Sequence, residues 1–408
     1  MEARVLLFIW QTLQLLIGFN LIFPLLLYFF YPAARNKFKP NKIWNQVTEP
    51  DYGIIVTAYK QTNALPAVVA SLLNQQYKNF MIYIVADQCD ITTLDFNHPQ
   101  VVVLRPETEL RSNTRSHFYA INRFARPHPR LTIIDSDNLV HPDYLTEMNV
   151  FFSKGYQAVQ GLRAAKNLNT TYACLDAARD IYYHFYDGML LFKAGSSATL
   201  SGSGMAFTTE LYRFCLENLN ITGAGFDKVL QAEIVKYRLQ IAYAEKAIVY
   251  DEKTAQPNQL VKQRSRWINS WFKYSGLGFG LIFKGFKNLS VNQVLFGTVL
   301  LRPPLFIFII LSAICAVVNI WLIPAYSIIW LAGIGAFILS FFIALLHTRT
   351  NYRIYRALFG IPKFMFYQVL SLLKMRKAND RSVATDHFYK SNSNNMMQKN
   401  YDQAGQYK

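Results

Sequence analysis

The chain is poor in cysteine, and the four cysteines that it has are widely scattered. Cys89, Cys174, Cys215 and Cys315 show no CxxC spacing, and Cys315 lies within an apolar segment. Structural zinc sites and disulfide frameworks both depend on regularly spaced cysteines. The sequence therefore argues against both kinds of site and predicts reduced thiols in the cytosol.

Acidic residues are scarce relative to basic ones. The chain has 42 Lys and Arg but only 25 Asp and Glu, which gives a formal net charge of +17. Such an excess suits either nucleic acid or the anionic surface of a membrane. No recognised nucleic-acid motif accompanies the charge, and the basic residues crowd near apolar segments. We therefore expect the lipid bilayer, and no nucleic acid, as a partner.

Charged side chains are absent from residues 5–31. This run is long enough to cross a bilayer, too long for a signal-peptide core, and lacks a small-residue cleavage site. We interpret residues 1–34 as a retained transmembrane anchor, which Pro24 could kink, with a buried globular helix as the alternative. The positive-inside rule places the next domain in the cytosol, beneath the cytoplasmic membrane. The basic flank that supports this orientation contains Arg35, Lys37, Lys39 and Lys42.

Two further long apolar runs predict a transmembrane hairpin over residues 303–347, with a turn at Pro324. Basic residues precede and follow the hairpin, so both of its ends are expected on the cytosolic side. Residues 275–302 and 348–378 mix basic side chains with aromatic and aliphatic ones and predict interfacial segments. The polar composition of residues 379–408 predicts a disordered tail.

Strand-like and helix-like stretches alternate between residues 53 and 135. The strand-like runs cover residues 53–57, 80–86, 101–104 and 131–135. Such alternation predicts an α/β fold with parallel strands and crossover helices, in which ligands gather outside the carboxyl ends of the strands. Asp87 and Asp135 both fall at such ends, which favours a site there.

Asp135 and Asp137 are separated by a single serine. Residues two apart in a strand project to the same side, so the two carboxylates could share one hard cation that keeps positions open for substrate phosphates. A plain polar turn is the alternative reading of Asp-Ser-Asp-Asn.

Three later features add to this pattern. Residues 200–207 contain two glycines, Gly202 and Gly204, which are typical of places where the backbone comes close to a ligand or to another segment. Asp227 lies near the start of a predicted helix, where N-capping is an alternative to a chemical role. The pentapeptide Gln263-Arg-Ser-Arg-Trp267 combines an amide, two cations and a large flat ring.

Taken in order, these motifs resemble the series found in membrane-embedded family-2 glycosyltransferases, the relatives of cellulose, chitin and hyaluronan synthases. The likeness covers residues 53–275 and the flanking membrane segments. It implies a GT-A domain with a Rossmann-like mixed sheet over residues 50–274, a UDP-sugar donor, and inversion at the anomeric carbon in a single displacement.

The resemblance assigns the donor side of the site residue by residue. Asp87 would hold the base or ribose of UDP, and Asp135 would lie near the ribose and sugar. Asp137, with Asp135, would bind Mg²⁺ or Mn²⁺, and Arg266 would hold the diphosphate. The chemistry asks for the same groups, because a divalent cation and an arginine stabilise the charge that develops on a UDP leaving group.

On the acceptor side, the resemblance makes Asp227 the general base and assigns Gln263, Trp267 and Gly204 to acceptor binding. The incoming hydroxyl must lose its proton, and a carboxylate suits that task. A tryptophan offers a flat apolar face on which a sugar ring can rest.

The chain departs from the family pattern at three places. Phe226 stands before Asp227 where the family has glutamate, and residues 57–60 lack the usual Pro-Ala-Tyr-Asn. His117 lies near a position where lysine is common. It could be a substitute phosphate contact or a surface residue, and we favour the surface residue.

The acceptor is left open by the sequence. We expect a saccharide acceptor in cell-surface polysaccharide or glycan synthesis, with a polyprenyl phosphate or another lipid carrier as the alternative. About three membrane spans are too few for a self-contained polymer channel, so export would need further subunits. A transporter or a non-catalytic binding module is disfavoured, because no charge lies deep within the hairpin.

Overall fold

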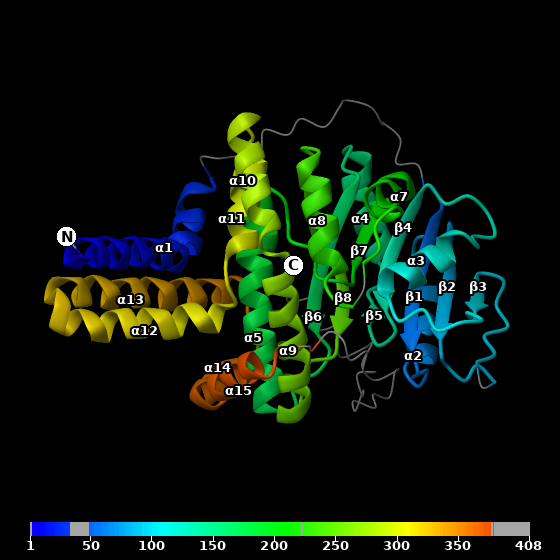
Figure 1. The fold of residues 1–408 in the computed structure, drawn as a ribbon. Helices are drawn as coiled ribbons and strands as arrows, with labels where there is room; N and C mark the ends of the chain where they lie inside the picture. The colour runs from blue at the N-terminus through cyan, green and yellow to red at the C-terminus, as the bar shows by residue number, and fades with distance from the viewer. Residues whose placement is uncertain (1, 33–48, 93, 222, 377, 379–408) are drawn as a thin grey trace.

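The structure is a computed structural model that describes residues 2–32, 49–92, 94–221, 223–376 and 378. An α/β domain occupies one side of the molecule, and long apolar helices project from the other side (Figure 1). The basic flank at residues 35–42 and the predicted tail at 379–408 lie outside the described residues.

The domain is built on an eight-stranded sheet in the order β3-β2-β1-β4-β7-β6-β8-β5. Strands β3, β2, β1 and β4 are parallel, as predicted, whereas β7 runs antiparallel to β4 and β6. The sheet is therefore mixed. The strands are β1 (Tyr52–Tyr59), β2 (Phe80–Asp87), β3 (Val101–Leu104), β4 (Arg130–Asp135), β5 (Leu139–Val140), β6 (Ala158–Ala165), β7 (Met205–Thr208) and β8 (Ile241–Asp251).

The sheet is buried on both faces. Successive side chains of a strand point to opposite sides, so each strand contributes to two apolar cores. Ile54 and Val56 of β1 join one apolar core, and Ile55 between them joins the other. Helices α2 (Leu65–Leu73) and α4 (Tyr144–Ser153) supply residues to the first core. The second core draws on α3 (Asn113–Ile121), α7 (Thr209–Leu216) and α8 (Phe226–Lys236).

Two longer helical stretches lie between this sheet and the membrane segments (Figure 1). Helix α5 (Thr171–Tyr183) continues through a π-helix, η1 (His184–Leu190), into the short α6 (Leu191–Lys193). Helix α9 (Pro257–Tyr274) begins at a proline, whose fixed φ and missing N–H suit the first turn of a helix.

Within the described residues, three helices are long and apolar enough to cross a membrane, namely α1 (Glu2–Phe30), α12 (Leu305–Leu322) and α13 (Pro324–His347). Helix α1 bends before its end, and Pro24 lies within it (Figure 1). One such helix at the N-terminal end and two at the C-terminal end agree with the prediction.

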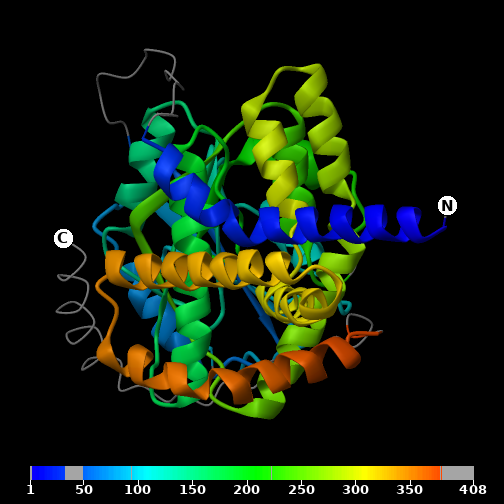
Figure 2. The ribbon, with the colours of Figure 1, turned by 90° about the vertical axis from the view of Figure 1, so that its left-hand side faces the viewer.

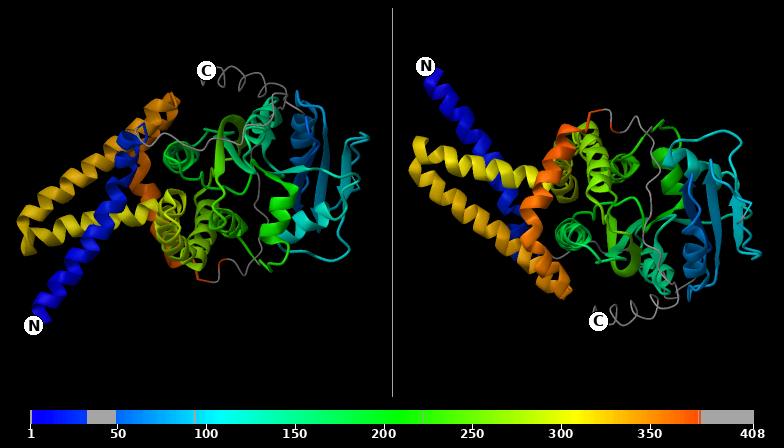
Figure 3. Two further views of the ribbon diagram at one scale, coloured as in Figure 1. Left: turned by 90° about the horizontal axis from the view of Figure 1, so that it is seen from above. Right: turned by 90° about the horizontal axis from the view of Figure 1, so that it is seen from below.

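Shorter helices border these spans on the side of the domain (Figures 2 and 3). Helices α10 (Leu277–Lys287) and α11 (Val291–Leu301) form a tight hairpin, in which a Cβ on Gly278 would lie 2.6 Å from the carbonyl oxygen of Gly297. Helix α14 (Tyr352–Ala357), a 3₁₀ turn, η2 (Leu358–Gly360), and α15 (Ile361–Leu373) follow α13.

Polar side chains join the three apolar helices. The Gln14 side-chain oxygen of α1 accepts hydrogen bonds from Asn319 of α12 and from the Trp330 indole of α13. The Trp10 indole donates to Asn319 at 3.2 Å. In a bilayer such groups have no water to bond to, so these contacts hold the three helices together.

Candidate active site

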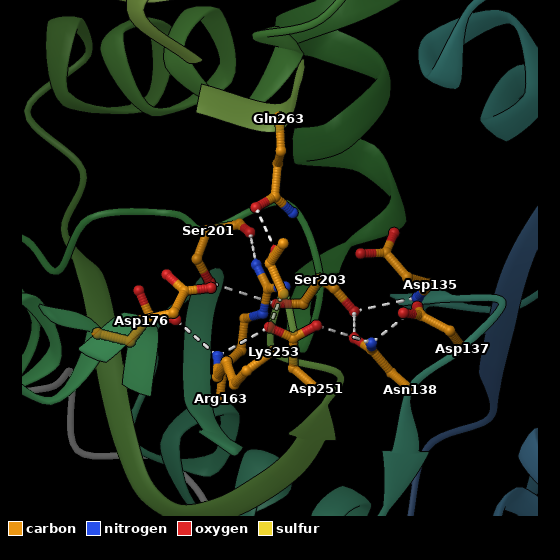
Figure 4. Close-up of polar contacts among 12 residues, drawn as sticks. Asp135, Asp137, Asn138, Arg163, Asp176, Ser201, Ser203, Asp251, Lys253 and Gln263 are labelled. Atoms are coloured by element: carbon orange, nitrogen blue, oxygen red, sulfur yellow. Dashed lines mark hydrogen bonds and ion pairs between the residues drawn. The ribbon is translucent and has the colours of Figure 1, made fainter. Parts of the chain in front are cut away.

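The carboxyl end of β4 delivers Asp135 and Asp137 into a buried hydrogen-bond network (Figure 4). Asn138 Nδ2 donates to the Asp137 carboxylate at 2.9 Å and to the Asp251 carboxylate at 3.2 Å. Lys166 Nζ donates to the backbone carbonyl of Asp137 at 3.2 Å. The acidic pair is therefore held from several sides, which a plain surface turn would not require.

The serine-glycine run before β7 supports this acidic loop. The Ser203 hydroxyl donates to Asn138 at 2.6 Å and accepts from the backbone N–H of Asp135 at 3.0 Å. Gly204 has φ +65°, and a Cβ on it would lie 3.0 Å from Val249 Cγ2. Gly204 is buried directly before β7. Its assignment to acceptor binding stays a prediction.

Asp87 ends β2 and is buried. Its carboxylate accepts hydrogen bonds from the backbone N–H groups of Leu110, at 3.2 Å, and Arg111, at 3.1 Å. Asp87 therefore shapes the loop after β3, at the edge where a nucleotide is expected. Contact with the base or ribose stays a prediction.

Helix α9 carries Gln263, Arg266 and Trp267 on one face, because residues three and four apart on a helix are neighbours. The Gln263 side-chain oxygen accepts from the Thr254 hydroxyl at 3.0 Å. Trp267 keeps 38% of its surface exposed. A half-exposed flat ring on a fixed helix is a suitable platform for a sugar.

Arginine side chains lie against the Trp267 ring. The guanidinium of Arg264 lies 4.0 Å from the ring centroid and that of Arg179 lies 4.7 Å from it. Arg264 is buried and pairs with Asp176. These contacts fix the orientation of the indole.

The motif arginine Arg266 differs from Arg264 in its surroundings. Among the described residues, no carboxylate forms an ion pair with the Arg266 side chain, which is half-buried. Burial lowers the pKa of its guanidinium. A partly desolvated cation without an acidic partner is suited to receive an anionic ligand.

A chain of buried ion pairs runs beneath the site, and the sequence analysis missed it. Lys253 Nζ lies 2.9 Å from the Asp251 carboxylate and 2.6 Å from the Asp180 carboxylate. Arg163 also pairs with Asp251, at 2.8 Å. Burial opposes ionisation of Asp251, but Arg163 and Lys253 outweigh it and lower its pKa to about 2.

This chain of ion pairs connects the two halves of the site. Asp251 bonds to Asn138, which holds Asp137, and Asp180 pairs with Arg179, which lies over Trp267. Figure 4 shows Asp135 and Asp137 at one end of the network and Asp176 at the other. Asp176, Arg179 and Asp180 lie three and four residues apart on α5, a spacing that places them on one face of the helix.

Asp227 lies in the first turn of α8, after the N-cap residue Gly225. Asp227 is therefore not the N-cap residue itself, but its carboxylate lies in the first turn, where the helix dipole favours a negative charge, so a helix-stabilising role stays open beside the chemical one. Gly225 has φ +102°, and a Cβ on it would lie 2.8 Å from the Tyr274 ring of α9. The Ser270 hydroxyl of α9 donates to the carbonyl of Ala224 at 3.3 Å. The start of α8 thus packs against the helix that carries the pentapeptide.

His117 is not a surface residue, so the interpretation favoured from the sequence is wrong. It is 1% exposed, and its Nδ1 lies 2.7 Å from the Tyr212 hydroxyl. Its ring meets that of Phe226 edge-on, with centroids 5.1 Å apart. Burial lowers the His117 pKa to about 3, so the ring is neutral at physiological pH. His117 and Phe226, which both depart from the family pattern, therefore pack against one another, and Phe226 is the residue before Asp227.

Comparisons with known proteins identify the family and the fold. A family model described as "Glycosyltransferase like family 2" matches residues 50–270. No curated protein sequence matches the chain. Among solved structures, a mannosyltransferase from Pyrobaculum calidifontis, PcManGT, in complex with GDP-Man and Mn²⁺, has a TM-score of 0.54 at 14% identity. That match covers 88% of this chain and 98% of the mannosyltransferase.

A second solved structure, S. aureus TarS, has a TM-score of 0.38 at 15% identity, and the match covers 57% of this chain and 40% of TarS. That likeness is too loose to support an argument. The mannosyltransferase match shows a GT-A-like fold. Because the family model spans more than half of the 408 residues, the chain belongs to glycosyltransferase family 2 and is an enzyme that transfers a sugar from a nucleotide-sugar donor.

Proposed function

We propose that this enzyme moves a sugar from a UDP-sugar onto a hydroxyl of a saccharide acceptor, with inversion, at the cytosolic face of the membrane. The product would belong to cell-surface polysaccharide or glycan synthesis. The observation that carries the proposal is Arg266, a half-buried cation without an acidic partner among the described residues, on the helix that also presents Trp267. A nucleoside diphosphate supplies the missing anion.

The acidic pair fits a hard divalent cation. Asp135 and Asp137 offer carboxylate oxygens at the strand end, and Asn138 and Lys166 hold Asp137 in place. Within the part of the chain that the structure describes, no group of three or more His, Cys, Asp and Glu side chains could hold a metal. Mg²⁺ and Mn²⁺ often take one or two carboxylates plus substrate phosphates, so this small donor set suits them. Such an ion supplies charge neutralisation at the diphosphate.

Three residues of the chain take the remaining roles in the transfer. Arg266 stabilises the negative charge that develops on the leaving diphosphate. Asp227, at the start of the neighbouring helix α8, accepts the proton of the incoming hydroxyl. Trp267 carries the acceptor ring on its exposed face, and Arg179 and Arg264 hold the indole.

A lipid-carrier acceptor, such as polyprenyl phosphate, is the second candidate. Helix α9 is directly bonded to the membrane-side helix α15, because the Ser265 hydroxyl donates to the Ser371 carbonyl at 3.0 Å. Helix α9, which carries Trp267, therefore lies close to where a lipid-linked substrate would arrive. The basic flanks of the membrane spans support a cytosolic catalytic domain in either case. Export of a polymer would need further subunits.

A donor panel tests the proposal. Purified protein with Mn²⁺ is incubated with radiolabelled UDP-sugars and GDP-sugars, and sugar transfer and nucleotide release are measured. We expect one UDP-sugar to be used, and Asp137→Asn to abolish its use. Asp143→Asn, which removes a more exposed carboxylate at the start of α4, is the matched control and should stay active.

Organic extraction of the labelled product identifies the acceptor. Label in the aqueous phase as saccharide supports the leading proposal, whereas label in the organic phase supports a lipid carrier. Use of a GDP-sugar alone would overturn the donor assignment. No transfer from any donor, with Asp137→Asn indistinguishable from the parent, would overturn the catalytic proposal.

A further inference from the structure

The segment that follows α13 is basic and contains no acid. Residues 348–378 include no Asp or Glu. Its basic residues with described side chains are Arg349, Arg353, Arg356, Lys363, Lys374 and Arg376. Within the described structure none of these cations forms an ion pair. The fold therefore leaves these positive charges without carboxylate partners among the described residues, although Lys363 Nζ lies 5.9 Å from the centroid of the Tyr172 ring.

The same segment exposes large apolar side chains at regular spacing. Tyr352, Phe359, Phe366 and Leu373 follow one another at seven-residue intervals and are 62%, 92%, 64% and 76% exposed. Seven residues are close to two helical turns, so these side chains line one face of the continuous helical segment α14-η2-α15. Arg356 and Lys363 each lie four residues after a member of this row, and so flank it.

The segment directly follows the last membrane span in the chain. Helix α13 ends at His347, and α14 begins at Tyr352, so the segment starts where the last membrane span leaves the bilayer. Figure 2 shows α14 and α15 lying across the end of the domain that bears the apolar helices. A helix with apolar side chains on one face and cations beside them is typical of binding in the interface of an anionic membrane.

The opposite face of the segment is joined to the active site. Ile354, Ala357 and Phe364 share a buried cluster with Leu260 of α9. The Ser265 hydroxyl donates to the Ser371 carbonyl at 3.0 Å, and the Asn269 side chain donates to the Met375 carbonyl at 3.1 Å. Ser265 stands directly before Arg266 in the chain. A displacement of α15 would therefore move the helix that carries Arg266 and Trp267.

We propose that residues 349–376 form a docking surface for anionic phospholipid headgroups, and that docking holds α9 in the position required for sugar transfer. The second half of this proposal rests on the proposed function. The first half concerns lipid contact alone and can be measured without activity.

Lipid contact is tested with one introduced cysteine. The four native cysteines are all buried, so Phe359→Cys can be labelled selectively with a polarity-sensitive fluorophore in the folded protein. The matched control is Phe214→Cys on α7, which is 60% exposed and lies on the α/β domain away from the spans (Figure 1). In nanodiscs of phosphatidylcholine with a quarter phosphatidylglycerol, we expect a blue-shifted emission for the label at 359 only. Equal, water-like emission at both positions would overturn the docking surface.

The charge requirement is tested by activity in the same nanodiscs. The parent should gain activity several-fold when phosphatidylglycerol is added to phosphatidylcholine. Each basic residue near an anionic surface contributes about fivefold in binding, so Arg353→Gln/Arg356→Gln should weaken binding to anionic lipid about 25-fold and remove most of this gain in activity. Lys78→Gln/Arg123→Gln removes two exposed cations from the region of α2 and α3 and should respond like the parent.

The outcomes separate the two proposals. Equal activation of the parent and Arg353→Gln/Arg356→Gln overturns the anionic docking surface while leaving the transferase proposal intact. No transfer in any lipid counts against the proposed function, and the emission of the label at 359 then still decides whether this surface meets lipid.

Discussion

The Arg264 guanidinium stacks on the indole of Trp267, 4.0 Å from the ring centroid, while it pairs with the buried Asp176 carboxylate. One arginine thus orients the expected acceptor platform and neutralises an acid beneath it. Arg264→Gln leaves Asp176 with the more distant Arg179, at 3.5 Å, as its ion-pair partner among the described residues. Removing one partner of a buried pair costs about 3–5 kcal/mol, so we expect a clear loss of thermal stability in detergent.

The control for this stability loss is Arg213→Gln, which breaks the more exposed pair with Glu217. Exposed pairs are worth about 0–1 kcal/mol, so its melting temperature should change little. Arg264→Gln should also lower kcat, because the Arg264 cation then no longer stacks on the Trp267 ring. Arg264→Met/Asp176→Leu should recover the stability but keep the low kcat, because that stacked cation is still missing. Equal losses for Arg264→Gln and Arg213→Gln would show that the buried pair has no special role.

Asp137→Asn should lower kcat by about 10²-fold or more, because the diphosphate charge loses the stabilisation that the acidic pair provides. The apparent affinity for Mn²⁺ should weaken in parallel, as measured by titrating the metal at saturating donor. Asp143→Asn should keep both values. A variant at position 137 with normal metal dependence would remove Asp137 from the metal-binding set.

Asp227→Asn separates a chemical role from a helix-stabilising one. If Asp227 is the general base, kcat should fall by about 10²–10⁴-fold with little change in donor KM. The loss of its charge at the start of α8 should cost only about 0.3–1 kcal/mol of stability. Steady-state kinetics and a thermal melt check both values. Full activity in Asp227→Asn would transfer the base role to another group.

The buried His117 makes stability depend on pH. Its pKa is lowered from 6.5 to about 3 by burial, so the unfolded state binds the proton more tightly than the folded state. The stabilising contribution is complete above pH 6.5 and is lost as the pH falls toward 3. Melting temperature measured from pH 7 to pH 4 should therefore fall.

His117→Gln should flatten that dependence without removing it. Burial also lowers the pKa of His184 to about 4, so protonation of His184 destabilises the folded protein at low pH as well. His184 remains in the variant. Identical pH profiles for the parent and His117→Gln would show that His117 is protonated as easily in the folded protein as in the unfolded chain.

The sequence predicted the part of the fold that follows from local pattern. The apolar runs around Ile54 and Ile82 lie at the centre of parallel strands, and Asp87 and Asp135 end theirs, because hydrophobic periodicity and strand ends are local features. Strand β8 departs from a simple local pattern. Residues 241–251 form a single β8, in which the exposed Glu245 and Lys246 interrupt the pattern without ending the strand.

The contacts that fix the candidate site could not be predicted in this way. Arg163 and Asp251 are far apart in the sequence, and only the parallel pairing of β6 with β8 brings them together. The burial of His117 likewise depends on Tyr212 and Phe226, which come from other helices. Pairings of this kind are set by tertiary structure and leave no periodic signal in a single sequence.

The hydrogen bonds of Gln14 have a consequence for biosynthesis. Gln14 is separated from its partners Asn319 and Trp330 by 305 and 316 residues, so its helix enters the bilayer long before they are translated. Until then its amide lies in lipid without these partners. The last two spans bring the two donors to the Gln14 side-chain oxygen, so their insertion is the step that ties the first span to the rest of the membrane part.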